Sequence, residues 1–206
     1  MKKFYTIRTG MLPTNTYILF DTETNGCVIV DPAYDARKVV AFVEENNLNL
    51  QGILLTHGHF DHCGGVGQIL QHKSVEVYGS SKDDFMAKNA SKNQWGARAM
   101  DCTITKFVEN LDKFVVGDFE FEVMETPGHT QGSLCYFCDG LMFSGDTLFD
   151  GCIGRTDLAG GNIEQMRQSL NKISQIDFDY IVLPGHQNDT TLFEQKAYNP
   201  YLKKVF

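Results

Sequence analysis

Three histidines and an aspartate stand within six residues of this chain, in the stretch "LLTHGHFDHCGG". They are His57, His59, Asp61 and His62, and the whole chain contains only six histidines. Imidazole nitrogens combined with carboxylate oxygens, without a set of thiolates, are donors by which proteins bind Zn, Fe or Mn. The stretch therefore indicates a metal site.

The spacing of these four residues divides them into two pairs. His57 and His59 lie two residues apart, so in an extended loop their side chains point to the same side and can share one ion. Asp61 and His62 can then face a second ion. The spacing therefore accommodates two metal ions.

Three more polar residues each follow a predicted strand, as the first four do. His129 follows "EVMETPG", Asp146 follows "LMFSG" and His186 follows "IVLPG". Loops at the ends of strands are where α/β proteins gather their ligands, so we expect four loops to meet at one site. His129 would complete the first set of donors and His186 the second. Asp146, with two carboxylate oxygens, can bridge two ions about 3.5–4 Å apart.

Strands and helices alternate along the chain in the way that positions such loops. Two tight turns, Asn25-Gly26 and Gly117-Asp118, predict β-hairpins. Apolar periodicity predicts the remaining elements, with residues 81–100 helical or irregular. The expected strands are 15–20, 26–31, 51–56, 75–80, 113–126, 133–137, 141–146 and 179–184, and the expected helices are 34–48, 62–72, 163–174 and 190–198.

Composition narrows the class of protein. With 206 residues, 42% of them hydrophobic, the chain can form one well-buried domain over residues 1–206. A net charge of -8 disfavours nucleic acid as a partner, because no basic surface is available to neutralise phosphates. Because the sequence contains no long apolar run, we expect no membrane segment and a cytoplasmic location. The six cysteines lack a framework spacing and are expected to be reduced core residues.

Four other residues are of a type that could take part in chemistry. His72 lies in a predicted helix, away from any cluster of glycine-flanked polar residues, and is interpreted as structural. Cys135 and Cys138 have zinc-knuckle spacing, but there is no second pair and a strand would turn their thiols to opposite sides. Asp31 ends an apolar strand. It is either a turn residue before Pro32 or a carboxylate that holds the tautomer of a ligand histidine.

The motifs "THGHFDH", "TPGHT", "SGDTLF" and "LPGH", in this order, resemble the metallo-β-lactamase superfamily over nearly the whole chain. Within it, "SGDTLFDGCIGRTD" resembles the glyoxalase II (hydroxyacylglutathione hydrolase) branch, including short forms without the C-terminal helical extension. The resemblance implies an α/β fold, a four-layer αββα sandwich in a single domain, with the site at one edge. It implies one metal held by His57, His59 and His129, a second held by Asp61, His62 and His186, and Asp146 between them.

The resemblance and the chemistry together predict a binuclear metallohydrolase acting on a small acyl-thioester through a metal-bridged hydroxide. Asp61 and Asp146 are the expected catalytic residues, Asp61 by orienting the hydroxide. A thiolate leaves without a proton donor, and the motif loops contain no spare acid, which favours a thioester over an amide. The expected cofactors are two divalent ions, zinc first, with iron or manganese as alternatives.

Several alternatives stay open on the sequence. A persulfide dioxygenase of the same superfamily would bind one iron through His57, His129 and Asp146 and shares the "GRTD" motif, although "GDTLF" is closer to the hydrolases. A β-lactamase is disfavoured because Asp146 is not in its usual ligand set, and a non-catalytic metal-binding module is the remaining alternative. Arg155 is either a contact for a substrate anion or the partner of Asp157. Only twenty residues follow His186, so the C-terminal helices that form much of the glutathione pocket in glyoxalase II are absent or shortened. The resemblance therefore does not extend to glutathione recognition.

Overall fold

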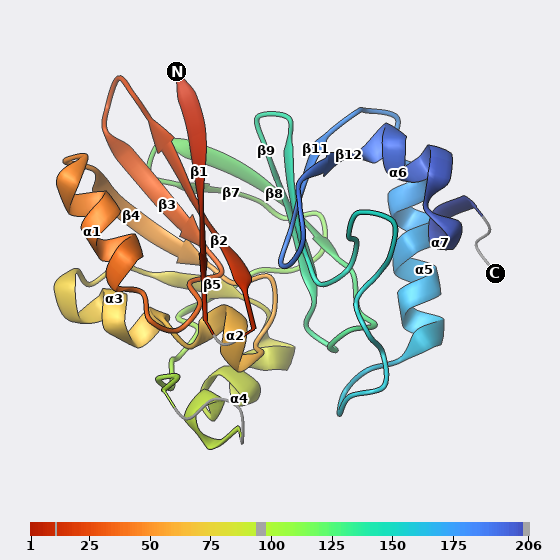
Figure 1. The fold of residues 1–206 in the computed structure, drawn as a ribbon, viewed down its shortest axis with the longest axis horizontal. Coiled ribbons are helices and arrows are strands. Elements are labelled where there is room, and N and C mark those ends of the chain that lie inside the picture. Colours follow the sequence, from red (N-terminus) through yellow and green to blue (C-terminus); the bar gives the residue numbers. More distant parts are fainter. Residues whose placement is uncertain (11, 94–97, 204–206) are drawn as a thin grey trace.

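Two six-stranded β-sheets lie face to face in the computed structural model, which describes residues 1–10, 12–93 and 98–203 (Figure 1). The first sheet has the order β1 (Lys2–Thr9), β2 (Thr14–Asp21), β3 (Gly26–Val30), β4 (Asn49–Leu54), β5 (Val77–Gly79) and β6 (Lys106–Phe107). The second has the order β12 (Thr190–Thr191), β11 (Ile181–Pro184), β10 (Leu141–Gly145), β9 (Leu134–Cys138), β8 (Phe119–Glu125) and β7 (Lys113–Val116).

Helices cover the outer faces of both sheets (Figure 1). On the side of the first sheet these are α1 (Arg37–Glu45), α2 (Phe60–Cys63), α3 (Val66–His72) and α4 (Asp84–Ala87), with the short 3-10 helices η1 (Ser81–Asp83) and η2 (Ala90–Lys92). On the side of the second sheet they are α5 (Ile163–Ser174), α6 (Leu192–Tyr198) and α7 (Pro200–Lys203).

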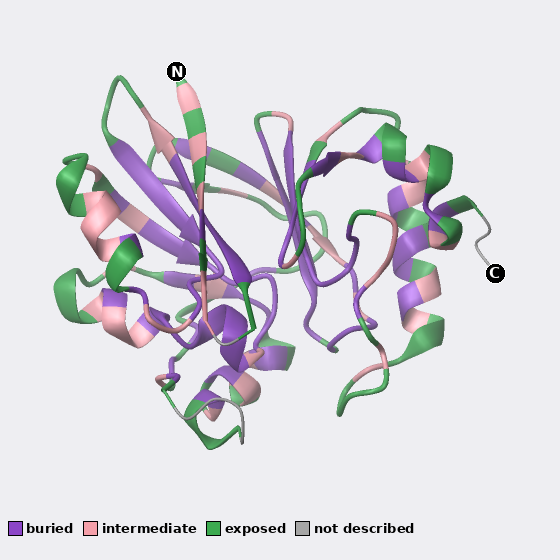
Figure 2. Ribbon diagram, viewed as in Figure 1, coloured by how far each residue is buried: buried purple, intermediate pink, exposed green. Residues whose placement is uncertain are grey.

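Alternation of side chains along the strands builds the layers. In β2, Ile18 packs toward the helices of the first sheet, whereas Tyr17 and Leu19 pack between the two sheets. Because both faces are covered, central strands such as β3 are buried at every residue (Figure 2). A third cluster lies between the second sheet and α5. The predicted four-layer αββα sandwich is confirmed.

The predicted hairpins are also present. β2 pairs with β3 through a turn at Asn25, and β7 pairs with β8 through a turn at Gly117, both residues having positive φ angles. The predicted single helix over 62–72 is wrong in one respect, because it is divided into α2 and α3. The division falls at Gly64 and Gly65, where helix propensity is low and the Gly65 N–H donates to the carbonyl of Pro32.

Strand direction brings the polar loops to one edge. β8, β10 and β11 run in the same direction in the second sheet, and β3 and β4 run parallel in the first. Two backbone hydrogen bonds tie the sheets together at the edge that carries the polar loops. The Leu134 N–H donates to the Thr56 carbonyl at 2.8 Å, and the Asn15 N–H donates to the Gly185 carbonyl at 2.7 Å. The loops after these strands are therefore held against one another.

Two expectations from composition concern the cysteines and membranes. All six cysteines are free and five are buried as predicted, whereas Cys152, also expected in the core, is only half-buried. Among the residues that the structure describes, no helix combines the length and the apolar character needed to cross a membrane.

Replacing Phe121 with Ala should lower the free energy of unfolding by about 3–5 kcal/mol, because the ring is fully buried between the sheets. The matched control is Phe85→Ala, which removes a ring that is 80% exposed and should change stability by less than about 0.5 kcal/mol. Denaturant unfolding measures both variants. Equal losses would contradict the assignment of the core to the space between the sheets.

Candidate metal centre

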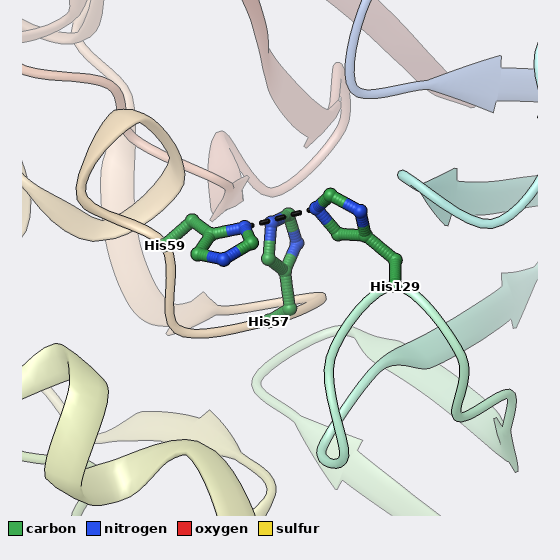
Figure 3. A group of neighbouring side chains, drawn as sticks. All are labelled: His57, His59 and His129. Atoms are coloured by element: carbon green, nitrogen blue, oxygen red, sulfur yellow. Dashed lines mark hydrogen bonds between the residues drawn. The ribbon is translucent and has the colours of Figure 1, made fainter. Parts of the chain in front are cut away.

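The first predicted set of donors lies together. Ligand atoms of His57, His59 and His129 lie within 4.8 Å of one another, and the three rings turn toward a common point (Figure 3). His59 Nδ1 is 2.9 Å from His129 Nε2. Two of these residues come from the loop after β4 and the third from the loop after β8, so the site joins the two sheets.

The second predicted set lies beside the first. Ligand atoms of Asp61, His62 and His186 also lie within 4.8 Å of one another. Asp61 Oδ2 is 3.4 Å from His186 Nε2 and 3.7 Å from His62 Nε2. Asp61 and His62 are carried by α2, which begins directly after the loop of the first set.

Asp146 stands between the two sets. Its Oδ2 is 3.3 Å from His129 Nε2 and 3.6 Å from His186 Nε2, and its Oδ1 is 3.4 Å from His62 Nε2. The carboxylate thus reaches donors of both groups, as a bridging residue must. Only glycine fits beside it at position 185, since a Cβ there would lie 2.3 Å from Asp146 Oδ1 and 2.4 Å from His62 Cε1.

Asp31 fixes the tautomers of two site histidines. Its Oδ1 accepts the Thr56 N–H at 2.7 Å, and its Oδ2 accepts the Thr56 hydroxyl at 2.6 Å and His62 Nδ1 at 2.9 Å. Because the Thr56 hydroxyl donates to Asp31, it accepts from His57 Nδ1 at 3.1 Å. In both imidazoles Nδ1 is therefore engaged by the chain, and Nε2 is the nitrogen directed to the site. These contacts favour the interpretation of Asp31 as a carboxylate that orients ligands over that of a turn residue.

Backbone carbonyls orient two other imidazoles. His129 Nδ1 lies 2.7 Å from the Arg155 carbonyl, and His186 Nδ1 lies 3.0 Å from the Pro13 carbonyl. A carbonyl only accepts, so each Nδ1 carries a hydrogen and each Nε2 is the nitrogen directed to the site. Sequence reasoning missed Thr56 and these two carbonyls, and residue type carries no signal for a backbone contact.

Charges around the site prepare some imidazoles as neutral ligands. Burial, together with the charge of His62, lowers the pKa of His57, and burial together with His129 lowers the pKa of His59 to about 4. Both are therefore neutral at physiological pH, with a lone pair available. Burial alone would raise the pKa of the Asp61 carboxyl, but the nearby His62 and His186 lower it, so Asp61 stays ionised.

Three carboxylates favour positive charge at the centre of the site. Burial would lower the pKa of His62, but Asp146, Asp61 and Asp31 raise it to about 10. In addition, His57 Nε2, His62 Nε2 and Asp146 Oδ1 are buried without a hydrogen-bond partner. Unpartnered buried donors and acceptors call for an explanation, and divalent cations would satisfy both the lone pairs and the negative charge. The residues present therefore fit the metals that their types predict.

Four other residues with a possible chemical role contribute no side chain to the donor groups. Arg155 pairs with Asp157 through two contacts of 2.7 Å, so of its two interpretations the ion pair is the one observed. His72 is exposed and faces Glu44 at 3.6 Å. Cys135 and Cys138 pack into different clusters on opposite sides of β9, as predicted.

A cavity of about 620 Å³ opens beside His59. Segment 80–101, for which the sequence predicts no role, supplies part of the cavity wall. Residues 94–97 of this segment lie outside the described part of the chain. Most of the lining is apolar. The lining residues are Leu12, His59, Phe60, Met86, Asn89, Ala90, Asn93, Arg155, Leu158 and Ala159.

Comparison with known proteins identifies the family. Residues 9–186 match the family model described as "Metallo-beta-lactamase superfamily". The chain belongs to the metallo-β-lactamase superfamily. It is similar to the "Hydroxyacylglutathione hydrolase GloC" of Haemophilus influenzae, with 35% identity covering 91% of this chain and 92% of the relative.

Solved structures of the superfamily resemble this chain closely. The BLEG-1 B3 metallo-β-lactamase superposes with a TM-score of 0.91 and 34% identity, covering 98% of this chain and 100% of that one. TTHA1623 in a di-iron-bound form gives a TM-score of 0.86 and 30% identity, with coverage of 96% and 100%. ETHE1 from Myxococcus xanthus gives a TM-score of 0.80 and 28% identity, covering 97% of this chain and 84% of that one. The family and its neighbours indicate divalent metal ions at the His and Asp cluster.

Removing a predicted ligand should lower the number of ions bound. Elemental analysis of the purified chain should give about two ions for the parent protein and about one for His57→Ala or His186→Ala, because each variant disables one donor group. The matched control is His72→Ala, which removes an exposed imidazole away from the site and should keep both ions. Full retention of metal by His186→Ala would contradict the assignment of the second group.

Proposed function

We propose that this protein is a binuclear metallohydrolase of small acyl-thioesters. The observation that carries the proposal is the position of Asp146, whose two oxygens lie within 3.3–3.6 Å of donors in both groups. Two complete sets of three donors sharing one carboxylate are what a two-ion site requires. The ligand assignment is the one expected from the sequence: His57, His59 and His129 for one ion, Asp61, His62 and His186 for the other, and Asp146 between them.

Two divalent cations bound here would bring the pKa of a coordinated water toward about 7 and polarise a substrate carbonyl. The chain itself supplies orientation. The Asp61 carboxylate, kept ionised by His62 and His186, can accept a hydrogen from the attacking water and so direct its lone pair. Asp146 holds the two donor groups at one separation. These two carboxylates are the proposed catalytic residues.

With metal bound, His62 gives up its extra hydrogen to act as a ligand, and no site histidine is then left as a proton donor, which supports a thioester. His57 and His59 are neutral at physiological pH, and the hydrogens on Nδ1 of His129 and His186 are engaged by backbone carbonyls. A thiol with a pKa near 8.5 departs as the thiolate without help, whereas an amine needs a proton. The 35% identity to a hydroxyacylglutathione hydrolase also supports a thioester substrate.

The cavity beside His59 suits the non-reacting arm of such a substrate. Arg155 is the one cationic side chain among the described lining residues, and its charge is already paired with Asp157. A pocket with this lining favours an arm without net charge over the two carboxylates of glutathione. We accordingly propose a small-molecule thioester with a neutral thiol arm, hydrolysed in the cytoplasm, with no nucleic acid or membrane partner.

Zinc is the proposed metal, because mixed nitrogen and oxygen donors without thiolate suit it. Iron and manganese bind the same donors, and the di-iron form of TTHA1623 makes iron the first alternative. The number and kind of bound ions distinguish the proposed hydrolase from the second candidate function, a persulfide dioxygenase that binds a single iron. The "GRTD" motif is compatible with that candidate, whereas the complete second group around His186 favours the hydrolase.

The zinc-loaded protein should hydrolyse acyl-thioesters, and His59→Ala should lower kcat/KM more than about 100-fold. Removing a residue that only hydrogen-bonds to a metal ligand typically lowers metal affinity or activity by about 10–100-fold, so removing a ligand itself should lower activity further. Hydrolysis is followed with a thiol reagent, and His72→Ala serves as the matched variant with unchanged rate.

The substrate panel separates the alternatives. It contains one acyl group on glutathione and on a neutral thiol such as N-acetylcysteamine, together with a β-lactam and, for the iron-loaded protein, glutathione persulfide with an oxygen electrode. We expect the neutral thioester to be the best substrate. Failure of every thioester to exceed the His59→Ala background would end the hydrolase proposal, and oxygen uptake would replace it with the dioxygenase.

A further inference from the structure

Asp83, which belongs to none of the recognised motifs, is a buried carboxylate that contacts two of the metal-binding loops. It ends η1 and is only 1% exposed. Its Oδ2 accepts the Gly58 N–H at 2.9 Å and the Thr130 hydroxyl at 2.6 Å, and its Oδ1 accepts the Gly132 N–H at 2.9 Å. One side chain therefore collects three hydrogen bonds from the chain around the first donor group.

These partners are adjacent to the ligands themselves. Gly58 stands between His57 and His59, and Thr130 directly follows His129. Asp83 thus connects the loop of the first sheet, which supplies two imidazoles, to the loop of the second sheet, which supplies the third.

The two loops close on Asp83 without spare room. A Cβ at Gly58 would lie 2.6 Å from the Asp83 carbonyl oxygen, and a Cβ at Gly132 would lie 2.5 Å from Asp83 Cγ. Both positions therefore require glycine. The carboxylate is in this way the spacer that sets how far apart the loops lie.

We propose that Asp83 is a positioning residue that fixes His129 relative to His57 and His59 and so determines affinity for the first metal ion. The inference rests on the proposed metal site. An amide cannot replace the carboxylate, because its NH₂ group would face an N–H or hydroxyl donor where an acceptor is required. Its effect should be local, since none of its three hydrogen bonds goes to α2 or to the loop of His186.

The test is a zinc titration of metal-free Asp83→Asn against a chromophoric chelator. We expect one of the two ions to bind about 10–100-fold more weakly, the range for residues that orient ligands, and the other to keep its affinity. The matched control is Asp84→Asn on the next residue. Asp84 pairs with Lys88 and the Ile104 N–H instead of a ligand loop, so its variant should keep both affinities.

A second variant and a spectroscopic measurement test whether the effect is confined to the three-histidine site. Thr130→Val removes one of the three bonds and should shift the same ion in the same direction by less. The absorption spectrum of the cobalt-substituted protein should lose the contribution of the three-histidine site in Asp83→Asn.

Unchanged affinities in Asp83→Asn would overturn the proposal. Equal weakening of both ions, with a lower melting temperature of the metal-free protein, would also overturn it by showing a general structural role. Because zinc is titrated directly, a protein that fails to hydrolyse thioesters leaves this test intact. If the parent protein binds only one ion, the two-ion site is refuted. The role of Asp83 then still requires that this ion bind more weakly to Asp83→Asn than to the parent protein.

Discussion

The structure depends on a set of buried lone pairs and carboxylates that the protein itself does not satisfy. His57, His62 and Asp146 are at most 9% exposed, and each has a ligand atom without a hydrogen-bond partner. Each buried polar group left unpaired costs about 1–3 kcal/mol, and negative charge gathered out of water costs more. A fold that accepts this cost at one edge is arranged for cations, because cations remove both penalties together.

The architecture meets this constraint by fixing the imidazoles from behind. Asp31 and the carbonyls of Arg155 and Pro13 each engage the Nδ1 of a different histidine, which leaves Nε2 directed inward. The sheets are joined at the same edge by backbone hydrogen bonds from Leu134 and Asn15. The donors are thus held before any ion binds, and binding need not order them.

Much of the site could be predicted from the sequence because side-chain type encodes it. The six-residue cluster at His57 and the polar residues after later strands identify the donors, and apolar alternation identifies the layers. Other features depend on tertiary contact, which residue type does not encode. The choice between the two interpretations of Arg155, the carbonyl of Pro13 behind His186, and the role of Asp83 between two loops could be found only from the structure.

The central claim is that two divalent cations share the carboxylate of Asp146, and anomalous diffraction from zinc-loaded crystals tests it most directly. The account predicts two zinc peaks, one against His57, His59 and His129 and the other against Asp61, His62 and His186, about 3.5–4 Å apart. A single peak at full zinc occupancy, or a second peak away from Asp146, would contradict it.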